Sequence, residues 1–279
     1  MSTSVLYDLP GPAARRRHRI AGGVGALGVA VVLGLVGVRL AEEGQFDART
    51  WEFLTVAGTY DAIWEGLVNT LRVAVVAVAL SLAFGGVLAV GRLSRPRLLR
   101  WPAIAIIEFF RAVPLLLLIL FVFLGFGNDI GRFWSLVTAL VLYNGSVLAE
   151  VFRAGIQAVP RGQREAAYAV GLRDSQVMRL VLAPQAVRVM LPAIISQSVV
   201  ALKDSALGLI IAYEELARVG RQLYVFYNNP LAVGVTIAAI YVVINYTLSR
   251  IAVLLEARQR RVGKAPAATA TQAVTGEPV

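Results

Sequence analysis

Residues 158–192 read AVPRGQREAAYAVGLRDSQVMRLVLAPQAVRVMLP and separate two long apolar runs of the chain. This connection is far longer than a hairpin between two helices needs, and long loops in compact domains are usually functional. Pro160 and Gly162 break the preceding helix, and we expect Glu165 in the first turn of a new one, where a carboxylate complements the helix dipole. Gly171 can supply the left-handed residue that ends this helix, so the segment predicts a short helix and a sharp turn.

The residues after this turn predict a second short helix, which Asp174 or Ser175 can cap. In the first helix, Ala166 and Ala167 belong to a small-residue face that permits close approach to a groove on another protein. An amphipathic helix resting on lipid headgroups would explain the same pattern. The residues by themselves leave both interpretations open.

The rest of the chain has the composition of a membrane protein. Of its 279 residues 58% are hydrophobic, and the mean hydropathy is +0.70, whereas soluble domains are roughly 45–50% apolar. Six apolar runs approach the roughly 20 residues that a membrane-spanning helix needs; they lie at about 20–40, 67–90, 104–126, 133–152, 191–212 and 231–255. We predict an all-α integral membrane protein with about six transmembrane helices, rather than a barrel.

The charges between these runs predict the orientation. Arginines precede the first run and are frequent after the second and the fourth, whereas the segment between the first two runs is mainly acidic. Because cytoplasmic loops are enriched in Lys and Arg, segment 158–192 and both termini are expected inside the cell. We therefore divide the chain into a cytoplasmic arm (1–19), an extra N-terminal transmembrane helix with its external loop (20–65), a core (66–256) that includes the cytoplasmic segment 160–184, and a disordered cytoplasmic tail (257–279).

The composition also argues against several functions. The formal net charge of +10 comes from clusters at the ends of apolar runs, so membrane topology explains it better than a nucleic-acid partner. Cysteine is absent and the single histidine, His18, lies in an arginine cluster, so we expect no metal site. Neither lysine belongs to a G-x-x-x-x-G-K-[ST] phosphate loop. With no nucleophile or base constellation either, we expect no ATPase site and no bound cofactor in this chain.

The spacing of residues in segment 158–192 carries a family resemblance. The segment resembles the cytoplasmic signature of ABC importer permeases: Glu165-Ala166-Ala167 is followed after three residues by Gly171, and after nine more by Val181-Leu182-Ala183-Pro184. Ala183 stands where that family usually has leucine, and Val181 replaces a common isoleucine. Both changes keep an apolar contact.

The resemblance extends over roughly residues 66–255 to the polar amino-acid permeases of the histidine, glutamine and glutamate systems. Four stretches carry it: Gly66–Leu71, Glu108–Leu116, Glu150–Ile156 and Lys203–Leu207. In the last stretch Ser205 and Ala206 stand where threonine and serine are more usual. The extra N-terminal span and the arm at residues 5–8 look like the longer permease of a glutamate-uptake system.

This resemblance implies a type I ABC importer permease in a bacterial cell membrane. In such systems the helix bearing Glu165, Ala166, Ala167 and Gly171 fits a cleft on a separate ATP-binding subunit and transmits its closure. The implied partners are a dimer of that ATP-binding subunit, a second permease or second copy of this chain, an extracytoplasmic solute-binding protein, the amino-acid substrate and membrane lipid. ATP would act on the partner, and the substrate would cross by alternating access.

Three pairs of ionisable residues fall within or near predicted spans: Glu108 with Arg111, Glu150 with Arg153, and Lys203 with Asp204. Charged groups at bilayer depth usually face a cavity or a partner. Each pair can be an ion pair that fixes helix packing. Adjacent helical residues point about 100° apart, so Lys203 and Asp204 each need a separate partner or solvent. Our hypothesis is that Arg111 and Lys203 present positive charge to substrate carboxylates, with Asp204 or Glu108 near the ammonium group.

Two other classes of protein remain as alternatives. A secondary amino-acid transporter driven by an ion gradient could also use intramembrane carboxylates, but it is expected to show internal repeats and interrupted helices. An intramembrane enzyme lacks support because no Ser/His or metal-ligand grouping is present. Within the preferred class, the sequence favours glutamate without separating it from glutamine, aspartate or a basic amino acid, and it leaves open whether the pore is homodimeric or heterodimeric.

Overall fold

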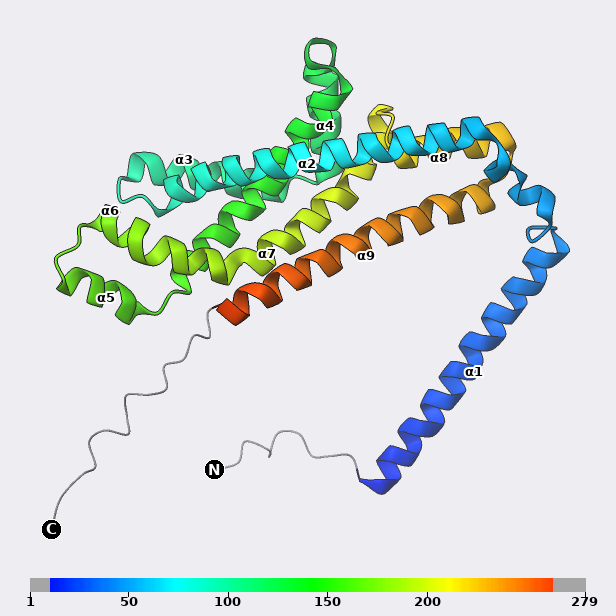
Figure 1. Cartoon of the computed structure of the whole chain (residues 1–279), viewed down its shortest axis with the longest axis horizontal. Helices are drawn as coiled ribbons and strands as arrows, with labels where there is room; N and C mark the ends of the chain where they lie inside the picture. The colour runs from blue at the N-terminus through cyan, green and yellow to red at the C-terminus, as the bar shows by residue number, and fades with distance from the viewer. Residues whose placement is uncertain (1–10, 263–279) are drawn as a thin grey trace. The chain divides into compact units, whose positions relative to one another are not determined.

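The computed structural model describes the backbone of residues 11–262 and the side chains of these residues except 252 and 255–262. The elements are α-helices, 3-10 helices (η2, η4) and one π-helix (η3). In chain order they are α1 (Pro12–Glu42), η2 (Ala48–Thr55), α2 (Ala57–Leu93), α3 (Arg97–Ala112), α4 (Leu115–Gln157), α5 (Arg161–Ala169), α6 (Asp174–Gln176), η3 (Val177–Leu182), α7 (Ala183–Asp204), η4 (Ser205–Ile211), α8 (Leu216–Tyr227) and α9 (Pro230–Val262). The all-α prediction is confirmed for this part of the chain (Figure 1).

The chain divides into two units, residues 1–59 and 60–279. In the first unit α1 begins at Pro12, because the fixed φ of proline suits the first helical position. The arginines of the predicted arm that follow Pro12 therefore belong to the helix itself. After α1, the indole of Trp51 donates a hydrogen bond to the carbonyl oxygen of Gln45 at 3.0 Å and holds the turn that precedes α2.

Five helical segments of the described residues are long and apolar enough to span a membrane, one fewer than the apolar runs. The difference arises because two predicted spans meet in α4. Val113 and Pro114 interrupt the run 104–126, since proline at 114 disfavours a helical conformation at the residue before it. Gly131, at φ 75° and ψ 170°, then breaks α4 itself into two helical parts. At the other end, α9 continues to Val262, into the predicted tail; residues 263–279 lie outside the described range.

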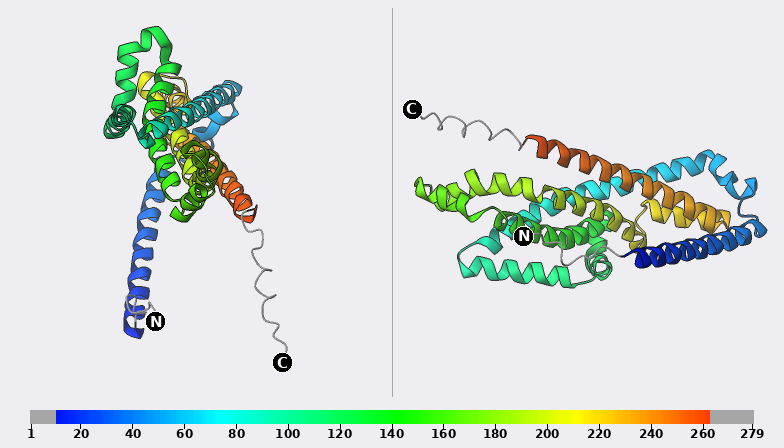
Figure 2. Two further views of the ribbon diagram at one scale, coloured as in Figure 1. Left: turned by 90° about the vertical axis from the view of Figure 1, so that its left-hand side faces the viewer. Right: turned by 90° about the horizontal axis from the view of Figure 1, so that it is seen from below.

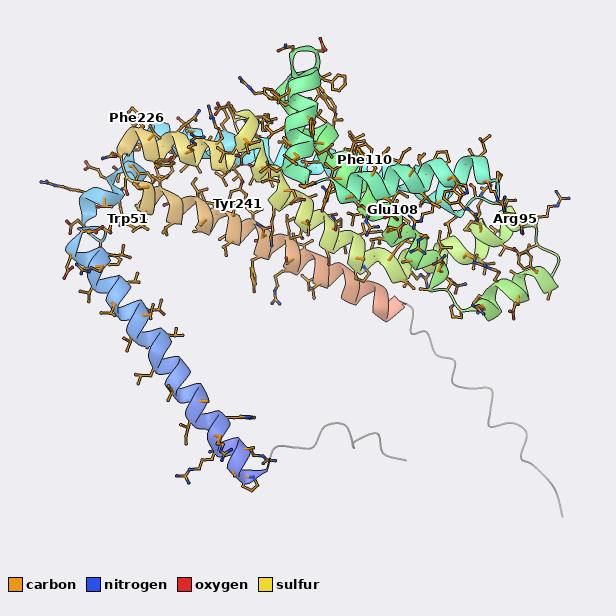
Figure 3. All side chains as sticks on the ribbon, turned by 180° about the vertical axis from the view of Figure 1, so that it is seen from behind. Trp51, Arg95, Glu108, Phe110, Phe226 and Tyr241 are labelled. Carbon is orange, nitrogen blue, oxygen red and sulfur yellow. The ribbon has the colours of Figure 1, made fainter. Side chains whose placement is uncertain are left out.

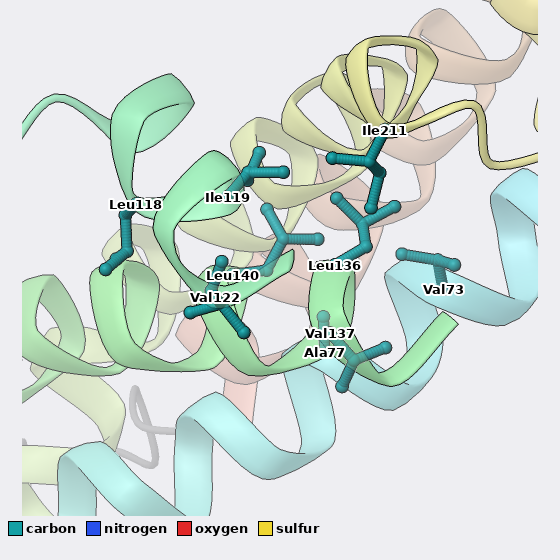
Figure 4. Close-up of a cluster of buried hydrophobic side chains, with 10 residues drawn as sticks. Val73, Ala77, Leu118, Ile119, Val122, Leu136, Val137, Leu140 and Ile211 are labelled. Atoms are coloured by element: carbon teal, nitrogen blue, oxygen red, sulfur yellow. The ribbon is translucent and has the colours of Figure 1, made fainter. Parts of the chain in front are cut away.

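The core of the second unit forms around α4. The second half of α4 contributes Leu136 and Leu140, which pack with Ile119 of its first half, Val73 of α2 and Ile211 of η4, all essentially buried (Figure 4). Around this cluster α7 lies between α4 and α9, as Figures 1 and 2 show. This arrangement exposes one end of the unit through α5 and α6 and brings α8 against α9 near the other end.

Two glycines allow α2 and α4 to cross closely. A Cβ at Gly85 would lie 2.6 Å from the carbonyl oxygen of Gly145, and one at Gly145 would lie 2.6 Å from the ring of Phe84. Small residues at a helix crossing let backbones approach and gain van der Waals contact, which drives helix association in lipid. This crossing fixes the position of α2 against the helix that carries Asn144 and Glu150.

Candidate functional site

The short helix α5 presents part of the predicted signature to solvent and buries the rest. Glu165 and Ala166 are exposed, whereas Ala167 is buried against Val177 and Leu182 of the following π-helix. The predicted left-handed turn is confirmed at Gly171, where φ is +79°. The alanine pair therefore has two roles: Ala167 anchors the helix, and Ala166 lies beside Glu165 on its free surface.

Two details of this segment differ from the sequence prediction. Pro160 takes the N-cap position, so α5 starts at Arg161, includes Gly162, and places Glu165 in its second turn rather than its first. The cap of α6 is Arg173 rather than Asp174 or Ser175, because the side-chain oxygen of Gln176 accepts a hydrogen bond from the Arg173 amide at 2.9 Å. Neither change alters the exposed face of α5.

A hydrogen-bonded brace joins this segment to the connection between α2 and α3. The hydroxyl of Tyr168 donates to Asp174 Oδ1 at 2.7 Å, and Arg95 lies 2.8 Å from Asp174 Oδ2. The hydrogen bond to Asp174 raises the pKa of the Tyr168 hydroxyl, which therefore remains a donor at neutral pH. These three residues were not among those predicted to be functional; the arginine-rich connection and the length of segment 158–192 were the only signals.

Four of the predicted intramembrane charges meet in one ion-pair network at the ends of α2, α3 and α4. Its centre is Arg92, which the sequence did not single out: its guanidinium lies 3.1 Å from Glu108 and 2.8 Å from Glu150. Arg153 lies 2.9 Å from Glu150, and Arg111 contacts Glu108 more loosely at 3.8 Å. The predicted intrahelical pairs exist, and Arg92 adds the contacts that connect different helices.

Lys203 and Asp204 lie apart from this network and point to different surroundings. Asp204 has a buried oxygen, Oδ2, without a hydrogen-bond partner among the described residues, and the same holds for the amide nitrogen of Asn144. Gln197, two turns before Asp204 on α7, donates to Asn144 Oδ1 at 2.6 Å. Lys203 instead lines a cavity of about 450 Å³ between α7 and α9. The structure thus brings a buried polar cluster to one side of α7 and an ammonium group to another.

The helix that carries Lys203 is interrupted. After η4, Ala212 adopts a left-handed conformation at φ 55°, and the chain resumes as α8 with Glu215 as its N-cap. Glu215 is fully buried, and its carboxylate accepts hydrogen bonds from the amides of Ala217 and Arg218 and, at 2.8 Å, from the hydroxyl of Tyr241 on α9. Irregular backbone at membrane depth is tolerated where protein or a cavity surrounds it.

This break is held from α2 as well. Thr70 is buried; its hydroxyl accepts a hydrogen bond from the Leu216 amide at 3.0 Å and donates to the carbonyl oxygen of Gly66 at 2.8 Å. Asn69 donates to the carbonyl oxygen of Glu214 at 2.9 Å. No local pattern separates Glu215 from its exposed neighbour Glu214, because only the tertiary contacts distinguish the two carboxylates.

The chain matches the family described as binding-protein-dependent transport system inner membrane component over residues 58–261. It is 43% identical to the glutamate transport system permease protein GluD of Corynebacterium glutamicum, over 81% of this chain and 85% of that protein. It is 34% identical to the probable glutamine ABC transporter permease protein GlnP of Bacillus subtilis, over 71% of this chain and 93% of that protein. A solved structure titled as an amino acid ABC transporter with histidines is similar at TM-score 0.70 and 33% identity, covering 74% of this chain and 98% of that one.

Proposed function

Since the chain belongs to the family of binding-protein-dependent transport system inner membrane components, and is thus a multi-pass amino-acid permease subunit of an ABC importer, we propose that it imports glutamate. Translocation proceeds by alternating access and is driven by ATP hydrolysis on a separate subunit. The family is one of transport subunits rather than enzymes, and we assign this chain no ATPase site and no bound cofactor of its own.

The observation that carries the coupling proposal is the geometry of α5. Its free surface offers Glu165 and Ala166, while the buried Ala167 and the turn at Gly171 hold the helix in place. The charges of α5 are mixed, because Arg161 and Arg164 are exposed on it as well as Glu165. The reasons for preferring a cleft on a dimeric ATP-binding subunit over a lipid surface are therefore the family match and the small exposed residue Ala166 beside Glu165. Closure of that dimer would move α5.

The complete importer in this proposal contains two copies of α5. They come from this chain and a second permease, or from two copies of this chain, above an ATP-binding subunit dimer. An extracytoplasmic solute-binding protein delivers the amino acid on the opposite face. Both termini of this chain lie in the cytoplasm, because the arginines that precede the first span and those that follow the last one favour that side.

The substrate-pathway candidates differ in their ion-pair contacts. One ion-pair network, centred on Arg92, contains Glu108, Arg111, Glu150 and Arg153. We therefore propose that these four residues hold α2, α3 and α4 together. Lys203 and Asp204 lie outside that network. We propose that this pair belongs to the pathway, with the cation of Lys203 facing a substrate carboxylate. The 43% identity to a glutamate permease is the reason for preferring glutamate.

The test is ATP-dependent uptake of labelled amino acids into vesicles that contain this chain with its ATP-binding subunit, its partner permease and its binding protein. We expect Glu165→Arg to reduce glutamate uptake at least ten-fold with normal membrane insertion. The matched control is Glu52→Arg, the same charge reversal at an exposed position outside the permease family match. Uptake that does not require ATP, is unchanged by Glu165→Arg and depends on a proton or sodium gradient would overturn the proposal.

A further inference from the structure

Two cavities adjoin along one face of α9. The first, about 450 Å³, is lined by Lys203, Ala206, Tyr241, Val242 and Asn245. The second, about 580 Å³, lies between η4, α8 and α9, and its lining includes Arg221, Tyr224 and again Tyr241. Tyr241 lines both cavities, so they adjoin at this side chain, and we call the two together the groove. Neither lining contains an Asp or Glu side chain, whereas each contains one cation.

The first cavity, called the inner cavity below, adjoins the stretch Pro230–Ile251 of α9, which is long and apolar enough to span a membrane. Tyr241 and Asn245 come eleven and fifteen residues after Pro230, the first residue of α9, which is about 16 and 22 Å along a helix. The hydrocarbon layer is about 30 Å thick. Figure 3 shows Tyr241 between Phe226 towards one end of the second unit and Arg95 at the other. Tyr241 and Asn245 therefore both lie within the length of α9 that the hydrocarbon layer would cover.

An unpaired cation at this depth is informative. Lys203 is exposed on the surface of the chain and takes part in none of the ion pairs among the described side chains. A lysine at mid-membrane that faced lipid would be costly, and such residues almost always face a water-filled cavity or a partner. The face of α7 with Lys203 is thus better suited to a solvated pathway than to lipid.

Asn245 adds an acceptor to this cation. Its amide nitrogen donates to the carbonyl oxygen of Tyr241 at 2.7 Å, which leaves Oδ1 buried without a hydrogen-bond partner among the described residues. The hydroxyl of Tyr241 is already committed to Glu215, so the ring serves as a fixed wall. Buried polar atoms are normally hydrogen-bonded. An unpartnered acceptor and an ammonium group that line the same cavity are the counterpart of a ligand with a cationic and an anionic group.

We propose that Lys203 and Asn245 form a binding station for the head group of an α-amino acid, with the substrate carboxylate on Lys203 and its ammonium group on Asn245 Oδ1. Arg221 is the first cation that an anionic solute meets on the way in. Gly220, its neighbour, packs on Ile237, and Ile237 is eight residues, or about 12 Å, from Asn245 along α9. A glutamate therefore contacts the two cations in sequence, which favours acidic over neutral amino acids. This inference rests on the proposed function.

The first experiment measures binding of labelled glutamate to the purified complex of permease and ATP-binding subunits, without nucleotide or binding protein. We expect Lys203→Gln and Asn245→Leu each to weaken binding at least ten-fold, and Lys203→Arg to restore most of the loss. Arg72→Gln is the matched control, because Arg72 is a cation in the middle part of α2 that stacks on Phe133 at 5.0 Å and lies outside the groove. In the wild type, glutamine should compete and γ-aminobutyrate, which lacks the α-carboxylate, should not.

The second experiment uses the absence of native cysteines. Ala206→Cys lines the inner cavity and should react with a charged, water-soluble thiol reagent, and glutamate should slow the reaction several-fold. Val243→Cys, on α9 but outside either lining, should not react. This pair keeps the inference testable even where Lys203→Gln does not assemble.

The outcomes separate the two proposals. If the wild type shows no ATP-driven amino-acid uptake, the proposed function fails. If uptake is normal but Lys203→Gln and Asn245→Leu bind glutamate as the Arg72→Gln control does, or Ala206→Cys stays unreactive, the groove faces lipid or a partner subunit. The binding station is then refuted while the importer assignment stands.

Discussion

Removing the buried carboxylate of Glu215 is expected to loosen α8 from α9. Three donors lose their acceptor in Glu215→Ala: the Ala217 and Arg218 amides at 2.8 and 2.7 Å and the Tyr241 hydroxyl at 2.8 Å. Loss of the N-cap costs about 1 kcal/mol, and an orphaned buried hydroxyl costs about 1–3 kcal/mol. We expect a net loss of about 2–4 kcal/mol in the free energy of unfolding. Glu215→Gln, which keeps one acceptor oxygen, should lose less.

The matched control is the adjacent residue. The side chain of Glu214 is 51% exposed and lies 3.8 Å from Arg218, and exposed ion pairs contribute about 0–1 kcal/mol. Glu214→Ala should therefore be nearly neutral. At about 2–4 °C per kcal/mol for a unit of this size, Glu215→Ala should lower the melting temperature of the detergent-solubilised complex by roughly 4–16 °C.

A double-mutant cycle tests the reasoning more closely. Tyr241→Phe removes the hydroxyl that Glu215→Ala would orphan, so the double variant should be about 1 kcal/mol more stable than the sum of the single effects. Equal melting temperatures for Glu215→Ala and Glu214→Ala, or strict additivity with Tyr241→Phe, would refute the account of Glu215 as the residue that joins α8 to α9.

Three further predictions concern other contacts. Gly85→Ala should lower the free energy of unfolding by about 1–3 kcal/mol through overpacking. Gly86→Ala should be neutral or stabilising, because its Cβ would meet no atom closer than 4.0 Å. In thermal unfolding, Gly85→Ala should therefore melt at a lower temperature than Gly86→Ala. Arg92→Gln leaves two carboxylates of its network without their central cation, so we expect a loss of about 1–3 kcal/mol, again by thermal unfolding, and no change would contradict the network. The hydrogen bond to Asp174 raises the pKa of Tyr168. This bond therefore stabilises the folded state at pH values below the ordinary tyrosine pKa, and the stabilisation is lost as pH rises through the raised pKa. Asp174→Asn should shift the titration of Tyr168 to lower pH, as measured by UV difference titration with Tyr168→Phe as the reference.

Several features of the molecule were predictable because they depend on local sequence. The apolar runs predicted a helical membrane protein, since in lipid only helices and closed barrels satisfy the backbone groups, and runs of about 20 apolar residues fit helices. Gly171 was predicted to be left-handed, because a helix that ends in this way favours a residue without a Cβ. The position of Pro114 is also local, but its effect of dividing one predicted span between α3 and α4 was not anticipated.

The partners of charged residues could not be predicted in the same way. Glu108 and Arg111 were expected to pair because they are three residues apart on one helix, yet Arg92, sixteen residues before Glu108, makes the shorter contact. Spacing within a helix fixes only which residues share a face. Which other helix lies against that face depends on packing, here on the close approach of α2 to α3, where a Cβ at Gly91 would lie 3.0 Å from that of Ala103.

The sequence by itself determined the class of the protein, its family and the position of the helix that carries Glu165, because hydropathy, charge asymmetry and a spaced motif are properties of the chain read in order. The tertiary structure alone decided the roles of individual polar residues. Glu214 and Glu215 are adjacent and chemically identical, but only Glu215 is buried under Tyr241. Burial, and the partner that makes it tolerable, come from segments distant in the sequence, so no local pattern can assign them.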